Sequence, residues 1–222
     1  EIVGFYQAGY SLVGRYFGMI FTAMGLEYYP RITRVCHSRL RTRVFASQEV
    51  NIMMLCLLPI ISIFLIAREL IVSILYSGEF RAIIPYISFA IVGTVMRAYS
   101  WFLAIVIVAR GDGKIYIVTE TLSVLTGFAL NVACYHLWGL AGLGVAFCLW
   151  YAAYCLIVGV VYFRSYGYSL SRQSSLFSLF TLTFCAAIVF LLNEGWLWAA
   201  IAATAIISLF AGIRLHRLVS HR

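Results

Sequence analysis

Long apolar runs are the feature that most limits what this chain can form. They are about 18–28 residues long, and a helix needs about 20 largely apolar residues to cross a hydrocarbon core roughly 30 Å thick. The expected membrane-spanning segments, about seven in all, are 3–29, 50–67 with an extension 70–76, 82–109, 115–135, 139–163, 175–192 and 196–213.

Composition supports the same conclusion. The chain is 64% hydrophobic and 11% charged, and its mean hydropathy is +0.97. These values are far more apolar than those of an ordinary soluble domain. The runs are also too long for the alternating strands of a membrane barrel, which are about 10 residues each. We therefore expect an all-α, polytopic transmembrane helix bundle.

The basic residues predict the orientation of this bundle. Outside the membrane, only Arg68 and Arg81 lie in the connections on one side. The other basic residues outside the membrane lie in the connections on the opposite side, which follow the first, third, fifth and seventh segments. These are Arg31, Arg34, Arg39, Arg41, Arg43, Arg110, Lys114, Arg164, Arg172, Arg214, Arg217 and Arg222. Because arginine and lysine collect in cytoplasmic loops, we expect this side, and with it the C-terminus, to be cytoplasmic. The formal charge of +8 is then explained without nucleic acid.

The expected start on the outer side has a further consequence. A chain that begins outside without a signal sequence requires an odd number of preceding helices. No basic region followed by a short apolar core is present at the start. We therefore expect the chain to be part of a longer polypeptide.

Two arginines interrupt the apolar segments at mid-membrane depth. Arg15 lies on a stripe of small and polar residues with Gln7 and Ser11, and Arg97 lies on a second stripe with Ser100. An arginine at this depth costs roughly 2.5–3.5 kcal/mol on insertion scales and usually faces a cavity or a partner. The planar guanidinium donates paired hydrogen bonds to phosphate oxygens. These five residues are therefore candidates to line a basic cavity that binds a phosphate or diphosphate.

A structural alternative stays open for both arginines. Glu120 lies on the polar face of the fourth segment with Tyr116 and Ser123, near the cytoplasmic edge. Either arginine can pair with Glu120, or with a carboxylate elsewhere in the polypeptide, and simply hold helices together. Glu120 itself is a candidate salt-bridge partner, an interfacial residue or a coupling carboxylate for protons or ions.

Sequence signals for enzymes, metals and cofactors are absent. Asp112 is the only aspartate, so acidic metal–diphosphate motifs such as DxD cannot occur, and there is no HExxH, GxSxG or P-loop. The only lysine, Lys114, is in a loop, which excludes a retinal Schiff base within a helix. The six cysteines show no metal-ligand spacing and are interpreted as small buried hydrophobes. We expect a protein that is not an enzyme and that holds no metal or cofactor.

Four stretches of the chain carry a family resemblance. They are V-G-F-Y-Q-A-G-Y (3–10), A-M-G-L-E-Y-Y-P-R-I (23–32), Q-E-V-N (48–51) and L-Y-S-G-E-F (75–80). In order and spacing they resemble the O-antigen and polysaccharide flippases, which are polysaccharide biosynthesis proteins of the multidrug/oligosaccharidyl-lipid/polysaccharide exporter superfamily. The most specific block contains Tyr28, Tyr29, Pro30 and Arg31, and it departs from the family at Glu27, where an aspartate is expected.

The resemblance implies a fold and a function. The chain would be the C-terminal lobe of a two-lobed transporter: residues 1–165 would form a bundle of about five helices, and 166–222 two further helices and a basic tail. The substrate would be an undecaprenyl-diphosphate-linked oligosaccharide, moved across a bacterial cytoplasmic (inner) membrane by alternating access for O-antigen and lipopolysaccharide synthesis. The implied partners are membrane lipid, the N-terminal lobe and other glycan-assembly proteins.

Three other functions are weighed against this one. A multidrug or cation exporter of the same superfamily needs acidic residues in its cavity, whereas the deep charges here are positive. A membrane enzyme of glycan assembly needs large external loops, and those predicted here are short. A structural scaffold does not account for two buried arginines on polar stripes.

Overall fold

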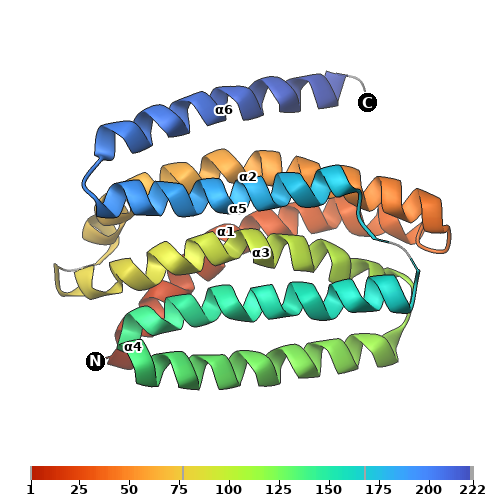
Figure 1. Ribbon diagram of the computed structural model, residues 1–222, viewed down its shortest axis with the longest axis horizontal. Coiled ribbons are helices and arrows are strands. Elements are labelled where there is room, and N and C mark those ends of the chain that lie inside the picture. The colour runs from red at the N-terminus through yellow and green to blue at the C-terminus, as the bar shows by residue number, and fades with distance from the viewer. Residues whose placement is uncertain (1, 77, 168, 221–222) are drawn as a thin grey trace.

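The computed structural model describes residues 2–76, 78–167 and 169–220, and its long elements are helices (Figure 1). Ser77 of the L-Y-S-G-E-F stretch and Arg222 of the basic tail lie outside the described residues. The elements are α1 (Ile2–Thr33), α2 (Arg39–Leu75), η1 (Gly78–Ile83), α3 (Ile84–Ala109), α4 (Gly113–Arg164), α5 (Arg172–Asn193) and α6 (Leu197–Ser220). The all-α fold is confirmed for the described part of the chain.

The longest helix, α4, reverses direction at Gly139. This glycine has φ 59° and ψ −138°, a conformation that a residue with a side chain rarely adopts. Residues 113–138 form a first leg and residues 140–164 a second, antiparallel leg (Figure 1). A Cβ atom at Gly142 would lie 2.1 Å from the Cys134 carbonyl oxygen, so the legs meet where no side chain fits. The described residues form six α-helices, and the predicted number of about seven is reached only by counting these legs separately.

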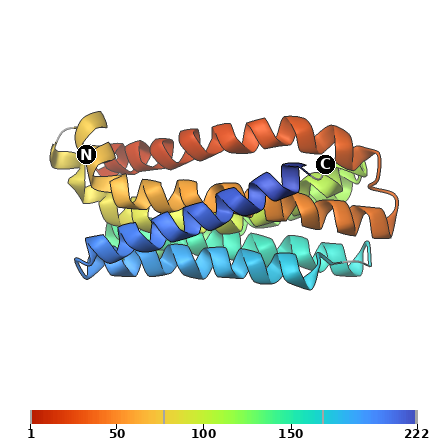
Figure 2. The same ribbon diagram turned by 90° about the horizontal axis from the view of Figure 1, so that it is seen from above.

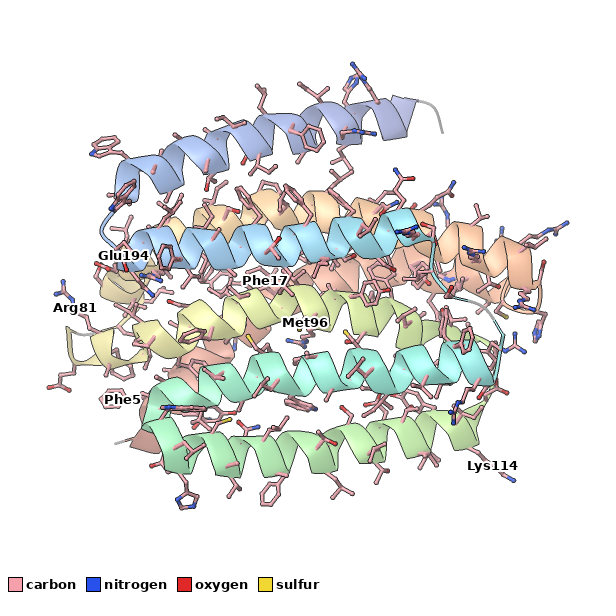
Figure 3. The ribbon with its side chains drawn as sticks, in the orientation of Figure 1. Phe5, Phe17, Arg81, Met96, Lys114 and Glu194 are labelled. Carbon is pink, nitrogen blue, oxygen red and sulfur yellow. The ribbon has the colours of Figure 1, made fainter. Side chains whose placement is uncertain are left out.

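The helices run along the long axis of the molecule, so the chain passes repeatedly between its two ends (Figures 1 and 2). The connections after α1, α3 and α4 lie at one end with the C-terminus, and Lys114 marks this end in Figure 3. Arg81 and Glu194 lie at the opposite end. The arginine-rich segments therefore gather at one end, which we call the basic end.

Among the described residues, five helical stretches are long and apolar enough to cross a membrane, and α1 is not one of them. The five include α2, α3 with η1, α4, α5 and α6. At 32 residues α1 is about 48 Å long. Its mean hydropathy is lowered by Arg15, by Gln7 and by the glycines and tyrosines of the helix. It nevertheless lies along α3, where the Phe21 and Trp101 rings are 5.6 Å apart. That α1 crosses a membrane stays a prediction.

The central helix is α3, which packs against α1, α2, α4 and α5. Ile87, Ile91 and Phe102 of this helix are completely buried. The apolar core built around them extends to Cys185 of α5 and Ala200 of α6. Residues before and after position 165 thus belong to one core, and the division into 1–165 and 166–222 stays a prediction.

Two predictions about loop arginines are wrong. Arg68, expected in an external connection, is 6% exposed within α2, because the helix continues unbroken to Leu75. Its guanidinium donates to Ser88 Oγ at 2.6 Å and to Asn193 Oδ1 at 3.1 Å, joining α2, α3 and the C-terminal end of α5. That end carries a partial negative charge, which favours a cation. At the basic end α2 begins at Arg39, so the arginines at 39, 41 and 43 lie in its first turns rather than in a loop.

Candidate functional site

A polar cavity of about 260 Å³ lies between α3 and the two legs of α4. It combines one arginine and one glutamate with hydroxyl groups and aromatic rings. The lining residues are Arg97, Ser100, Trp101, Ala104, Ile105, Val108, Tyr116, Glu120, Ser123, Val124, Trp150, Tyr151 and Tyr154. Met96, which precedes Arg97 in α3, lies near the middle of the bundle in Figure 3. Arg97 therefore contacts the cavity far from both ends of the bundle.

Aromatic rings, not carboxylates, surround the Arg97 guanidinium. Its central carbon lies 5.2 Å from the centre of the Phe21 ring and 5.8 Å from that of Tyr151. Cations are attracted to the faces of such rings. Within the described part of the chain this guanidinium forms no ion pair. Its five N–H donors are therefore not committed to a carboxylate.

Glu120 belongs to the same cavity but is held by a tyrosine of the other leg of α4. The Tyr154 hydroxyl donates a hydrogen bond to Glu120 Oε1. The sequence left open that Arg97 pairs with Glu120. In the structure Glu120 accepts from Tyr154 instead and forms no ion pair with Arg97. The cationic guanidinium of Arg97 and the carboxyl group of Glu120 therefore both line the cavity without forming an ion pair with each other.

A second contact fixes the two legs of α4 beside this hydrogen bond. The Trp150 indole N–H donates to Ser123 Oγ at 3.0 Å, and its ring lies directly on Gly127. A Cβ atom at Gly127 would be 2.5 Å from that ring. Trp150 also stacks on Tyr151, with ring centres 5.1 Å apart, and Tyr151 is the residue that faces Arg97. The glycine thereby sets the position of the aromatic wall.

The α3 wall of the cavity is positioned by α1. Trp101 packs on Gly25, where a Cβ atom would be 3.1 Å from its ring, and lies against Phe21. Ser100 is buried, and its hydroxyl donates to the Arg97 carbonyl oxygen at 3.0 Å. Ser100 therefore lines the cavity while its proton is used within α3.

The candidate residues of α1 do not join this cavity. Gln7 and Arg15 are exposed and Ser11 is half-buried. Arg15 lies instead in an open groove of about 690 Å³ along α1, with Gly14, Gly18, Met19, Thr22, Ala23 and Leu26. The structure thus brings together Arg97, Ser100 and Glu120, and it leaves Gln7, Ser11 and Arg15 on a separate surface.

The block that carries the family resemblance forms a junction at the basic end. Tyr28 is 1% exposed, stacks on Phe45 and donates to the Phe102 carbonyl oxygen at 3.3 Å. Arg31 pairs with Glu27 at 2.9 Å and lies 3.9 Å from Glu49 of α2. Tyr29 and Pro30 are exposed. These contacts join α1 to α2 and α3, which is a structural role.

Aromatic residues are the part of the site that sequence reasoning missed. Trp101, Trp150, Tyr151 and Tyr154 line the cavity, and none was a candidate. The available signal was the spacing of Trp150, Tyr151 and Tyr154 on one face of the fifth apolar segment. Such a stripe is equally typical of a packed core. Within the described residues, no three His, Cys, Asp or Glu side chains form a group that can hold a metal ion.

No protein-family model matches the chain, and no curated protein matches it.

Proposed function

We propose that the chain is part of a transporter that moves an undecaprenyl-diphosphate-linked oligosaccharide from the cytoplasmic to the outer leaflet of a bacterial inner membrane. One observation carries the proposal: Arg97 faces a polar cavity between α3 and the two legs of α4 and forms no ion pair within the described residues, although Glu120 lines the same cavity. A guanidinium that is costly to place at this depth is retained with its donors free for a ligand. Phosphate oxygens are the ligands that its planar fork suits best.

The cavity residues take different parts in this proposal. Arg97 binds the phosphate oxygens, while Trp101 and Trp150 offer flat apolar surfaces beside it. Tyr154 keeps Glu120 away from the arginine. Glu120 is the candidate for coupling to protons or ions, because its carboxylate accepts the Tyr154 hydrogen bond that joins the two legs of α4.

Alternating access requires a second wall facing this bundle. The groove that contains Arg15, with Gln7 and Ser11 on the same helix, is an open and mainly apolar face of α1 that such a wall would cover. We place an N-terminal lobe of the same polypeptide there, as in the two-lobed transporters that the sequence resembles. In this arrangement the basic end and the C-terminus are cytoplasmic, other glycan-assembly proteins supply the substrate, and the chain is not itself an enzyme.

The presence of Glu120 favours a second candidate, an exporter of organic cations from the same superfamily. A carboxylate surrounded by aromatic rings is also a typical environment for a cation. The two candidates differ in what they require of Arg97. A flippase depends on Arg97 to bind the phosphate, whereas a cation exporter depends on Glu120 and tolerates Arg97→Gln.

Complementation tests the proposal. The complete polypeptide is expressed in cells that lack their own flippase, and surface polysaccharide and inner-leaflet lipid-linked glycan are measured at matched protein levels. We expect Arg97→Ala to lower surface glycan about tenfold or more, the loss of a charge-assisted contact, while the lipid-linked intermediate accumulates. The matched control is Arg164→Ala, an exposed arginine at the basic end. Equal transport by both variants would exclude Arg97 as the anion site.

A further inference from the structure

A second cavity, of about 330 Å³, lies near the basic end between α2, α5 and α6. It shares no lining residue with the Arg97 cavity. Half of its lining is polar and half is apolar. The residues are Asn51, Leu55, Gln173, Phe177, Phe210 and Arg214. In Figure 1 α6 is the outermost helix, so this cavity is at the periphery of the bundle.

One polar atom of this cavity lacks a partner. Asn51 Oδ1 is buried and accepts no hydrogen bond within the described residues. A buried acceptor in this state costs about 1–3 kcal/mol, so it indicates a donor that the chain itself does not provide. Asn51 is a residue of α2, and the groups that face it come from α5 and α6.

A cation and a helix N-terminus lie on the other sides of the cavity. Arg214 is exposed, its guanidinium carbon is 5.7 Å from the Phe210 ring centre, and it forms no ion pair within the described residues. Gln173 is the second residue of α5, which begins at Arg172. The Ser171 side chain caps this helix by accepting a hydrogen bond from the Ser174 N–H, and the first turn carries a partial positive charge. Both features favour an anion beside an acceptor that needs a donor.

The depth of the cavity identifies which anion is available. Arg214 is the first charged residue after the apolar run 196–213, so it lies at the level where hydrocarbon gives way to lipid headgroups. Leu55 and Phe177 continue the cavity as apolar surface toward the hydrocarbon. This order of groups matches a lipid that enters from the side, phosphate outward and acyl chains inward.

We propose that this cavity is a binding site for a resident glycerophospholipid of the cytoplasmic leaflet. The lipid phosphate accepts hydrogen bonds from the Arg214 guanidinium and the Gln173 amide. A hydroxyl or ammonium group of the headgroup donates to Asn51 Oδ1. The site fixes α6 to α2 and α5, and it is separate from the transported substrate, so it does not depend on the proposed transport function.

Native mass spectrometry of the delipidated full-length protein tests this site. The probes are dioleoyl-phosphatidylglycerol, dioleoylglycerol, which lacks the phosphate, and inorganic phosphate. We expect wild type and Arg164→Gln to retain phosphatidylglycerol, and Arg214→Gln to bind it about tenfold more weakly, the loss of one charge-assisted contact. Asn51→Leu is expected to lose the lipid while unfolding at an unchanged or higher temperature without lipid, because it removes the unpaired acceptor.

Three results would overturn the proposal. The first is equal retention of phosphatidylglycerol by Arg214→Gln and Arg164→Gln. The second is equal retention of dioleoylglycerol and phosphatidylglycerol by wild type, which would show that only the acyl chains are held. The third is protection against thermal unfolding by millimolar inorganic phosphate equal to that by the lipid, which would assign the site to free phosphate.

Discussion

Replacing Gly127 by alanine is expected to destabilise the wall of the Arg97 cavity. The new methyl group would lie 2.5–2.8 Å from three atoms of the Trp150 indole. Two of these atoms are the ring-fusion carbons and the third is the indole nitrogen, so the whole rigid indole has to move. When it moves, the Trp150 bond to Ser123 and the stacking on Tyr151 are both lost or weakened.

The size of the effect follows from these contacts. Overpacking of a filled site costs about 1–3 kcal/mol, the lost hydrogen bond about 0.5–1.5 kcal/mol and the weakened stacking about 0.5–1.5 kcal/mol. Against this, alanine is favoured over glycine in a helix by about 1 kcal/mol. The free energy of unfolding should therefore fall by about 3 kcal/mol, within a range of roughly 1–5 kcal/mol.

Thermal unfolding of the purified protein in detergent measures this change, with tryptophan fluorescence as a second readout. Gly159→Ala is the matched control, because Gly159 lies in the second leg of the same helix and nothing is within 4 Å of a Cβ atom there. We expect the control to be neutral or slightly stabilising. A Gly127→Ala protein as stable as Gly159→Ala would refute the reasoning.

A double-mutant cycle tests the cause as well as the size. If the indole is what the methyl group displaces, then Gly127→Ala should cost little in a Trp150→Leu background, where no ring occupies the space. The coupling between the two substitutions should then be about 3 kcal/mol, nearly the whole cost of Gly127→Ala and at the upper end of the range for residues in direct contact. Additive effects would show that Gly127 matters for another reason.

Three further substitutions are expected to lower the thermal stability in the same assay. Arg68→Leu removes the hydrogen bonds that Arg68 of α2 donates to Ser88 of α3 and Asn193 of α5, at a cost of about 1–3 kcal/mol. Gly139→Ala places a side chain on a backbone with φ 59° and should cost about 1–3 kcal/mol, whereas Gly212→Ala, in open space, should be neutral. Tyr28→Phe loses one buried hydrogen bond, about 0.5–1.5 kcal/mol, while Tyr29→Phe on the exposed side should change little.

The helices were predictable because apolar runs of spanning length leave the chain few alternatives. Their ends were less predictable, since hydropathy detects the apolar part of a helix and not the helix itself. Backbone hydrogen bonding carries α2 back to Arg39 through polar residues that hydropathy assigned to a loop. It likewise carries α2 forward through Arg68 to Leu75, and that continuation is what buries Arg68 against its neighbours.

For the site residues, the sequence predicted the depth along a helix but not the face of the helix that meets a neighbour. Counting residues placed Arg97 far from both ends, which agrees with the position of its neighbour Met96 in Figure 3. Counting also placed Arg15 at a similar depth, yet Arg15 is exposed on the outer face of α1 and Arg97 is not. Helical periodicity tells which residues share a face, but it does not tell which face meets a neighbouring helix.

The hydrogen bond between Tyr154 and Glu120 depends on packing between helices, which the sequence does not reveal. Tyr154 is 34 residues away in the sequence, and the two meet only because the chain reverses at Gly139. Close approach at Gly142 fixes the register of the legs on either side of that turn. A different register would bring other groups to Glu120 and could leave it free to pair with Arg97. The turn glycines, which carry no charge, therefore set the packing in which Arg97 forms no ion pair within the described residues.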